Sequence, residues 1–82
     1  MNTKLYVDNL PYTINNNDLS DTFKSHGTVI SAKVVTDKES GRSKGFSFVE
    51  MENENEASSA IKALNGTDLK GRKLIVAAAK AS

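Results

Sequence analysis

The sequence has 82 residues, of which 38% are hydrophobic and 26% are charged, which predicts one small folded domain rather than two domains or a disordered chain. It contains no cysteine, which excludes disulfides, thiolate metal sites and thiol nucleophiles. Its single histidine, His26, argues against histidine clusters and Ser-His-Asp triads. No apolar run approaches the roughly 20 residues that span a bilayer, and the first residues lack a secretory signal, so we expect a cytoplasmic protein with no membrane partner.

The first part of the chain predicts a strand followed by a helix. Residues 4–9 alternate between apolar and polar side chains, which is the period of a strand. The helix is expected over 16–26, where Asn15 is a good N-cap and Asp18 lies three residues further on, as in a weak capping box. Gly27 is placed to end this helix in a left-handed conformation.

The rest of the chain predicts two strands, a second helix and a last strand. These elements cover 29–36, 44–51, 53–65 and 74–79, with a turn-rich connection at 69–73. Asn53 caps the second helix, and Glu56 at the third helical position predicts a fuller capping box than that of the first helix.

The predicted order is β-α-β-β-α-β, which defines the fold class. Two such split units form an α+β, ferredoxin-like sandwich, in which a four-stranded antiparallel sheet carries both helices on one face. We expect residues 1–82 to form this single domain. The other face of the sheet is then left bare.

Strand parity predicts which side chains occupy the bare face. The apolar residues of alternate positions must meet the helices: Leu5, Val7, Val49, Met51, Leu74 and Val76. Tyr6, Phe46 and Phe48 therefore point the other way, into solvent, where clustered aromatic rings indicate a binding partner. A register shifted by one residue would instead bury lysine and glutamate, which makes it the poorer interpretation.

Basic residues are expected around these rings. Lys4 and Lys44 lie on the same predicted face, Lys33 on the neighbouring strand and Arg42 in the adjacent loop. The net charge is only +1, but the two predicted helices hold four acidic and two basic residues, which leaves nine Lys/Arg against six Asp/Glu elsewhere. Rings with a cationic rim suit single-stranded nucleic acid, whose bases stack on the rings while its phosphates meet the cations.

Two segments resemble the motifs of a known family. Residues 44–51, KGFSFVEM, are similar to the octamer of the RNA-recognition motif, and residues 5–10, LYVDNL, are similar to its hexamer. The resemblance covers almost the whole chain. In its short form the chain looks most like small bacterial and cyanobacterial members and the related domain of plant glycine-rich RNA-binding proteins.

The resemblance implies roles for individual residues. Tyr6 and Phe48 would each stack under a base, Phe46 would contact the sugars between them, and Lys44 would bind phosphate. Asn9 would fix the end of its strand rather than touch RNA. Lys80 and the outer face of the last strand would line the exit of this surface, with Ile75, Ala77 and Ala79 on that face.

The chain departs from the family pattern at a few positions. Ser47 replaces glycine or alanine on the helix-facing side, and Met51 replaces an aromatic residue with a structural role. Asp8 stands where glycine is frequent, and Glu50 adds a second negative group on the binding face. A carboxylate at position 8 can repel phosphate or accept a hydrogen bond from a base amino group, and the sequence does not decide between these effects.

Functions other than RNA binding are compatible with parts of this pattern. Members of this fold can bind peptides through the sheet or through a helix face, here Leu19 with Phe23 or the helix over 57–64, but those members usually lose the three rings. Single-stranded DNA is an alternative ligand, because no residue identifies a contact to the 2′-OH. Phosphatases and metal carriers share the layout, but the loops lack a glycine-rich cradle and paired metal ligands. We therefore expect a monomeric binding module that is not an enzyme and uses no metal or cofactor.

Overall fold

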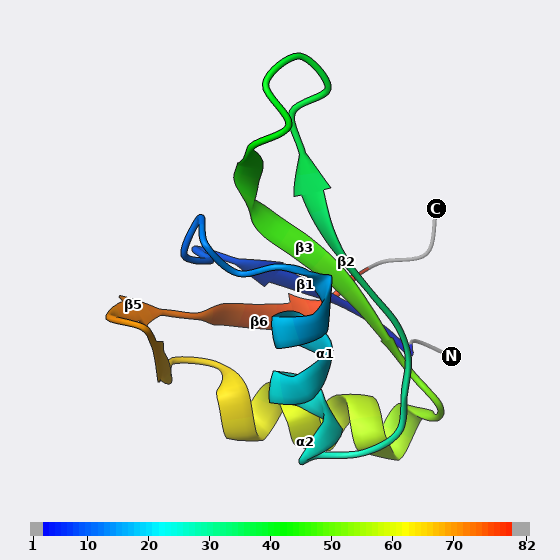
Figure 1. Cartoon of the computed structure of the whole chain (residues 1–82). Helices are drawn as coiled ribbons and strands as arrows, with labels where there is room; N and C mark the ends of the chain where they lie inside the picture. The colour runs from blue at the N-terminus through cyan, green and yellow to red at the C-terminus, as the bar shows by residue number, and fades with distance from the viewer. Residues whose placement is uncertain (1–2, 80–82) are drawn as a thin grey trace.

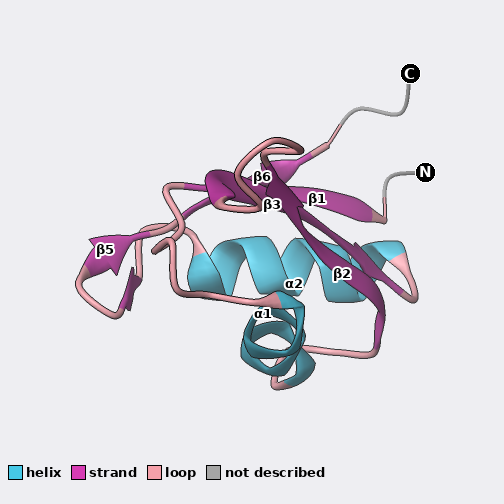
Figure 2. Ribbon diagram, turned by 45° about the horizontal axis from the view of Figure 1, so that its top comes forward, coloured by secondary structure: helices cyan, strands magenta, loops and turns pink. Residues whose placement is uncertain are grey.

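The computed structural model describes residues 3–79 and has the expected order of elements (Figure 1). The two helices and the strands of the main sheet have the following bounds: β1 Lys4–Asp8, α1 Asn16–Lys24, β2 Val29–Thr36, β3 Ser43–Met51, α2 Glu54–Leu64 and β6 Ile75–Ala78. Both helices lie on the same side of the sheet (Figure 2), which confirms the predicted α+β sandwich. No helix among the described residues is long and apolar enough to cross a membrane.

The main sheet has the strand order β2-β3-β1-β6, with antiparallel pairing throughout. The two strands with the family motifs, β1 and β3, are therefore neighbours in its centre. Their register places Tyr6 opposite Phe48 and Asp8 opposite Phe46. Residues that are opposite each other in such a pair share a face of the sheet, so the outward residues of both strands form one continuous surface.

The hydrophobic core lies between the sheet and the helices, as parity predicted. The six residues predicted to face the helices are each at most 2% exposed: Leu5, Val7, Val49, Met51, Leu74 and Val76. Leu19 and Phe23 of α1 are fully buried against them, whereas Ile61 of α2 packs at the edge and is only partly buried. Because Leu19 and Phe23 are buried, the alternative that they bind a peptide is wrong.

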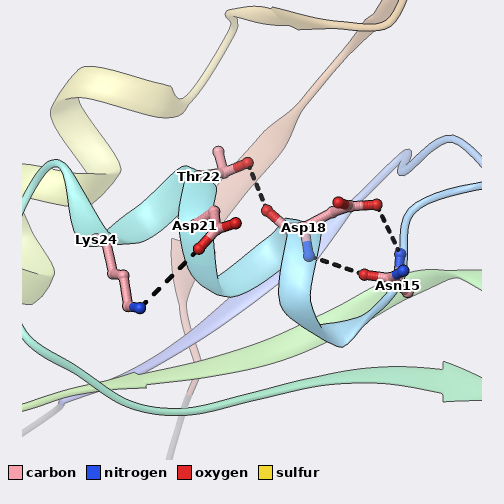
Figure 3. A network of polar contacts seen from close by, with 5 residues as sticks. All are labelled: Asn15, Asp18, Asp21, Thr22 and Lys24. Carbon is pink, nitrogen blue, oxygen red and sulfur yellow. Dashed lines mark hydrogen bonds and ion pairs between the residues drawn. The ribbon is translucent and has the colours of Figure 1, made fainter.

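The capping box of α1 is complete. Asn15 Oδ1 accepts a hydrogen bond from the backbone N–H of Asp18 at 2.8 Å, and Asp18 Oδ2 accepts one from the N–H of Asn15 at 3.4 Å (Figure 3). The helix ends at Lys24 rather than at residue 26, because Ser25 already serves as its C-cap. Gly27, with φ of +152°, lies two residues beyond this cap and therefore does not end the helix, which corrects the prediction, although its positive φ still favours glycine.

Only one of the two hydrogen bonds of the predicted capping box forms at α2, which corrects the prediction for this helix. Asn53 Oδ1 accepts a hydrogen bond from the N–H of Glu56 at 2.8 Å, but Glu56 Oε2 accepts one from the N–H of Thr28 at 3.0 Å. The Glu56 carboxylate thus ties the loop after α1 to the start of α2. Gly27 permits this contact, because a Cβ atom built on it would lie 2.7 Å from the Cβ of Glu56.

The turn-rich connection before the last strand is a small hairpin. Its strands, β4 Asp68–Leu69 and β5 Arg72–Lys73, pair antiparallel around Lys70 and Gly71, which have φ of +50° and +88°. Two consecutive residues with positive φ are typical of a type I′ turn. The hairpin leads directly into β6, which begins one residue later than expected and ends one residue earlier.

Candidate nucleic-acid interface

Three aromatic rings cluster on the outer face of β1 and β3. The ring centroids of Tyr6 and Phe48 are 5.7 Å apart, those of Tyr6 and Phe46 are 5.8 Å apart, and those of Phe46 and Phe48 are 6.3 Å apart. We call Tyr6, Phe46 and Phe48 the aromatic platform. The platform is half-buried rather than fully exposed, because its rings shield one another. Both helices lie on the opposite side of the sheet (Figure 2), so no described helix covers the platform.

The lysines predicted for the rim do border the platform. The Nζ atom of Lys4 lies 5.5 Å from the centroid of the Phe48 ring, within the range of a cation–π contact. Lys33 on β2 lies opposite Phe48 in the strand register. Lys44 is exposed and precedes Phe46 by two residues on the same face of β3. Phe48 thus has one lysine near its ring, Lys4, and a second lysine, Lys33, opposite it on β2.

The remaining predicted residues fall into different positions. Asp8 lies on the sheet face between Phe46 on β3 and Ile75 on β6. Arg42 is exposed in the loop before β3 and lines a groove rather than the platform. Lys80 lies outside the described residues.

The groove that Arg42 lines has a volume of about 590 Å³ and lies between the β1–α1 loop and the β2–β3 loop. Its lining residues are Tyr12, Thr13, Gly41, Arg42 and Ser43. None of the platform rings borders it. Base stacking needs the open face of a ring, so the candidate interface is the flat sheet surface and not this hollow.

Asn9 holds the end of β1 by contacts that are distant in the sequence. Its Nδ2 donates a hydrogen bond to the carbonyl of Lys73, and its Oδ1 accepts one from Nη2 of Arg72, both at 2.7 Å. Asn9 has φ of +61°, a conformation that asparagine tolerates better than most residues. The implied structural role of Asn9 is therefore confirmed, and its amide is engaged within the fold.

Tyr12 and Arg72 form a pair that sequence reasoning missed. Tyr12 is 66% exposed, and the guanidinium carbon of Arg72 lies 5.8 Å from its ring centroid. Since Arg72 belongs to the β4–β5 hairpin, this contact depends on the fold and leaves no signal in the local sequence.

Ser47 lies on the helix-facing side of β3, as strand parity predicted. It is 0% exposed, and its Oγ has no hydrogen-bond partner among the described residues. No group of three or more His, Cys, Asp or Glu residues within 3–79 is arranged to hold a metal ion.

Comparison with known proteins identifies the family. Residues 5–75 match the family model for the RNA recognition motif. The chain belongs to this family. It is 49% identical over 73 residues to a protein of Arabidopsis thaliana named RNA-binding protein CP31B, chloroplastic, a match that covers 89% of this chain and 25% of that protein. The chain therefore spans about a quarter of the length of that relative.

Solved RNA recognition motifs have the same fold. A crystal structure described as RNA Binding Protein PG1 is 48% identical and superposes with a TM-score of 0.94, covering 98% of this chain and 96% of that one. A structure described as the Rna15 RRM with bound RNA (GU) is 30% identical with a TM-score of 0.89, covering 99% of this chain and 86% of that one. The arrangement of two helices on one face of the sheet is thus the arrangement of the family.

Proposed function

We propose that this RNA recognition motif binds single-stranded RNA on the open face of its sheet. The observation that carries the proposal is the aromatic platform, whose three rings lie within 6.3 Å of one another on the side away from both helices. Tyr6 and Phe48 each stack a base, and Phe46 contacts the sugars between them. RNA in the Rna15 RRM structure and the name of the Arabidopsis relative support the choice of RNA.

The basic residues around the platform contact the phosphates in this proposal. Lys4, Lys33 and Lys44 border the rings, and Arg42 contacts RNA that continues toward the β2–β3 loop, while the contact expected from Lys80 stays a prediction. Stacking contributes about 1–3 kcal/mol per base, so two stacked bases give roughly 2–6 kcal/mol before ordering costs. We expect an affinity of about 1 μM for a short oligonucleotide and broad tolerance of sequence.

The test is binding of a labelled octameric RNA of mixed sequence, measured by fluorescence anisotropy. We expect Phe48→Ala to weaken binding by at least about fivefold, because one stacked base is lost. Tyr6→Ala combined with Phe46→Ala should weaken binding further. Ile30→Ala is the matched control, because Ile30 is 59% exposed and lies outside the platform.

Unchanged affinity in Phe48→Ala, with the fold verified by circular dichroism, would exclude stacking on the platform. The DNA octamer of the same sequence measures the preference for RNA. Peptide binding that leaves the NMR signals of the platform unshifted would favour a protein-binding module instead.

The wider predictions follow from the same proposal. We propose that residues 1–82 act as one monomeric binding domain, without enzymatic activity, metal or cofactor. The name of the Arabidopsis relative places that protein in the chloroplast, so the relative does not support the expected cytoplasmic location, and the compartment of this chain stays a prediction.

A further inference from the structure

Asp8 places a carboxylate among the residues of the proposed binding face. It is half-buried on β1, two residues after Tyr6. Its neighbours across the sheet are Phe46 on β3 and Ile75 on β6, so apolar side chains flank it on both sides. A negative group at such a position is unexpected on a surface that binds a polyanion.

The Asp8 carboxylate has no partner within the described chain. No hydrogen bond or ion pair among residues 3–79 involves its side chain. The other acidic residue on this face, Glu50, differs because it lies directly opposite Lys4. Both carboxylate oxygens of Asp8 are thus available to accept hydrogen bonds from a ligand.

The strand geometry brings this carboxylate to the edge of a stacked base. Side chains that lie opposite each other on an antiparallel pair have Cβ atoms about 5 Å apart, which applies to Asp8 and Phe46. Tyr6 lies two residues before Asp8 on the same face, about 7 Å along the strand. Asp8 is therefore a direct neighbour of both rings on this face, which are themselves 5.8 Å apart, and its carboxylate is close enough to meet the edge of a base seated there.

The chemistry of a carboxylate discriminates between the bases. Guanine presents two adjacent donors, N1–H and the N2 amino group, which match the two oxygens of a carboxylate. Cytosine and adenine each present one amino group, next to a ring nitrogen that repels the carboxylate. Uracil presents only N3–H, between two carbonyl oxygens that are also repelled.

We propose that Asp8 is a specificity-determining residue that selects guanine and disfavours uracil at the base beside Tyr6 and Phe46. This inference rests on the proposed RNA binding and adds a base preference to it. Of the two effects that the sequence leaves open, it assigns to Asp8 the acceptance of hydrogen bonds from a base, which repulsion of phosphate alone does not provide.

The experiment compares octamers of uridine with octamers in which one central uridine is replaced by guanosine. We expect the protein to bind the guanosine octamer about tenfold more tightly, the range of one bidentate contact to a base. Asp8→Ala should bind the two octamers within about twofold of each other. Asp8→Asn, which keeps the shape but has one acceptor and one donor group, should also lose most of the preference.

Two controls separate base selection from charge. Glu50→Gln removes one negative charge from the same face and should raise affinity for both octamers equally, so that the preference remains. Inosine in place of guanosine removes only the N2 amino group, and it should weaken binding of the unaltered protein but not of Asp8→Ala.

The inference is overturned if Asp8→Ala and Asp8→Asn raise affinity for both octamers by the same factor, because Asp8 then acts by repulsion alone. A protein that binds neither octamer contradicts the proposed function itself. The two failures are thus distinguishable in one set of titrations.

Discussion

Individual residues of the platform were predictable because alternation along a strand is a local property. Once Leu5 and Val7 face the helices, Tyr6 between them must face outward, and the same holds for Phe46 and Phe48. The structure adds what parity cannot supply, which is that the rings are close enough to shield one another. The contacts of Asn9 with Arg72 and Lys73 were not predictable in detail, because they join residues more than 60 positions apart in the chain.

Ser47 carries a prediction of its own. A buried hydroxyl without a partner loses its hydrogen bonds to water on folding, and the family pattern has glycine or alanine at this position. We expect Ser47→Ala to stabilise the protein by about 1 kcal/mol and to raise Tm by roughly 4–8 °C, as measured by thermal unfolding.

Ser31 provides the control for Ser47. It is exposed on β2, so Ser31→Ala should leave Tm nearly unchanged. A decrease of Tm in Ser47→Ala would show that the hydroxyl has a stabilising partner.

At the scale of elements, residue patterns within a few positions predict where the helices and strands lie. Contacts between elements then determine which side-chain hydrogen bonds form at their ends. Asn15 and Asn53 cap the two helices as expected, because a cap depends on residues three positions apart. Glu56 fits the local capping-box pattern equally well, but it bonds the N–H of Thr28 from a loop that only the tertiary fold brings near. The sequence predicts only a turn where the β4–β5 hairpin forms, because each of its strands has two residues, too few to show alternation.

Gly27 tests the docking of the α1–β2 loop on α2. A Cβ atom at this position meets Cβ, Cγ and Cδ of Glu56 within 2.9 Å, and its φ of +152° is strained for any L side chain. We expect Gly27→Ala to lower the free energy of unfolding by about 2–4 kcal/mol, as the sum of overpacking and backbone strain, measured by urea denaturation.

Gly66→Ala separates the two contributions to this loss. Gly66 also has a positive φ, of +84°, but an added Cβ there meets nothing within 4 Å. This variant should lose only about 1 kcal/mol, from backbone strain alone. Equal losses in the two variants would mean that the contact with Glu56 is easily relaxed.

At the scale of the whole molecule, positive charge is distributed unevenly although the net charge is only +1. The outer face of the sheet holds three lysines, which are Lys4, Lys33 and Lys44, and two carboxylates, which are Asp8 and Glu50. Such a mixed face attracts a polyanion weakly. Stacking on the platform is therefore expected to supply more of the affinity than phosphate contacts do.

The salt dependence of RNA binding measures this balance. If two to four phosphates are contacted, the logarithm of the association constant should fall with the logarithm of salt concentration with a slope of about −1.4 to −2.8, at roughly −0.7 per contact. Lys44→Gln should reduce the steepness by about 0.7, because one contact beside Phe46 is lost. Lys62→Gln is the control, since Lys62 is exposed on α2, on the other side of the sheet. If Lys62→Gln reduces the slope as much as Lys44→Gln does, RNA is held by the overall electrostatic field of the protein and not by contacts on the sheet face.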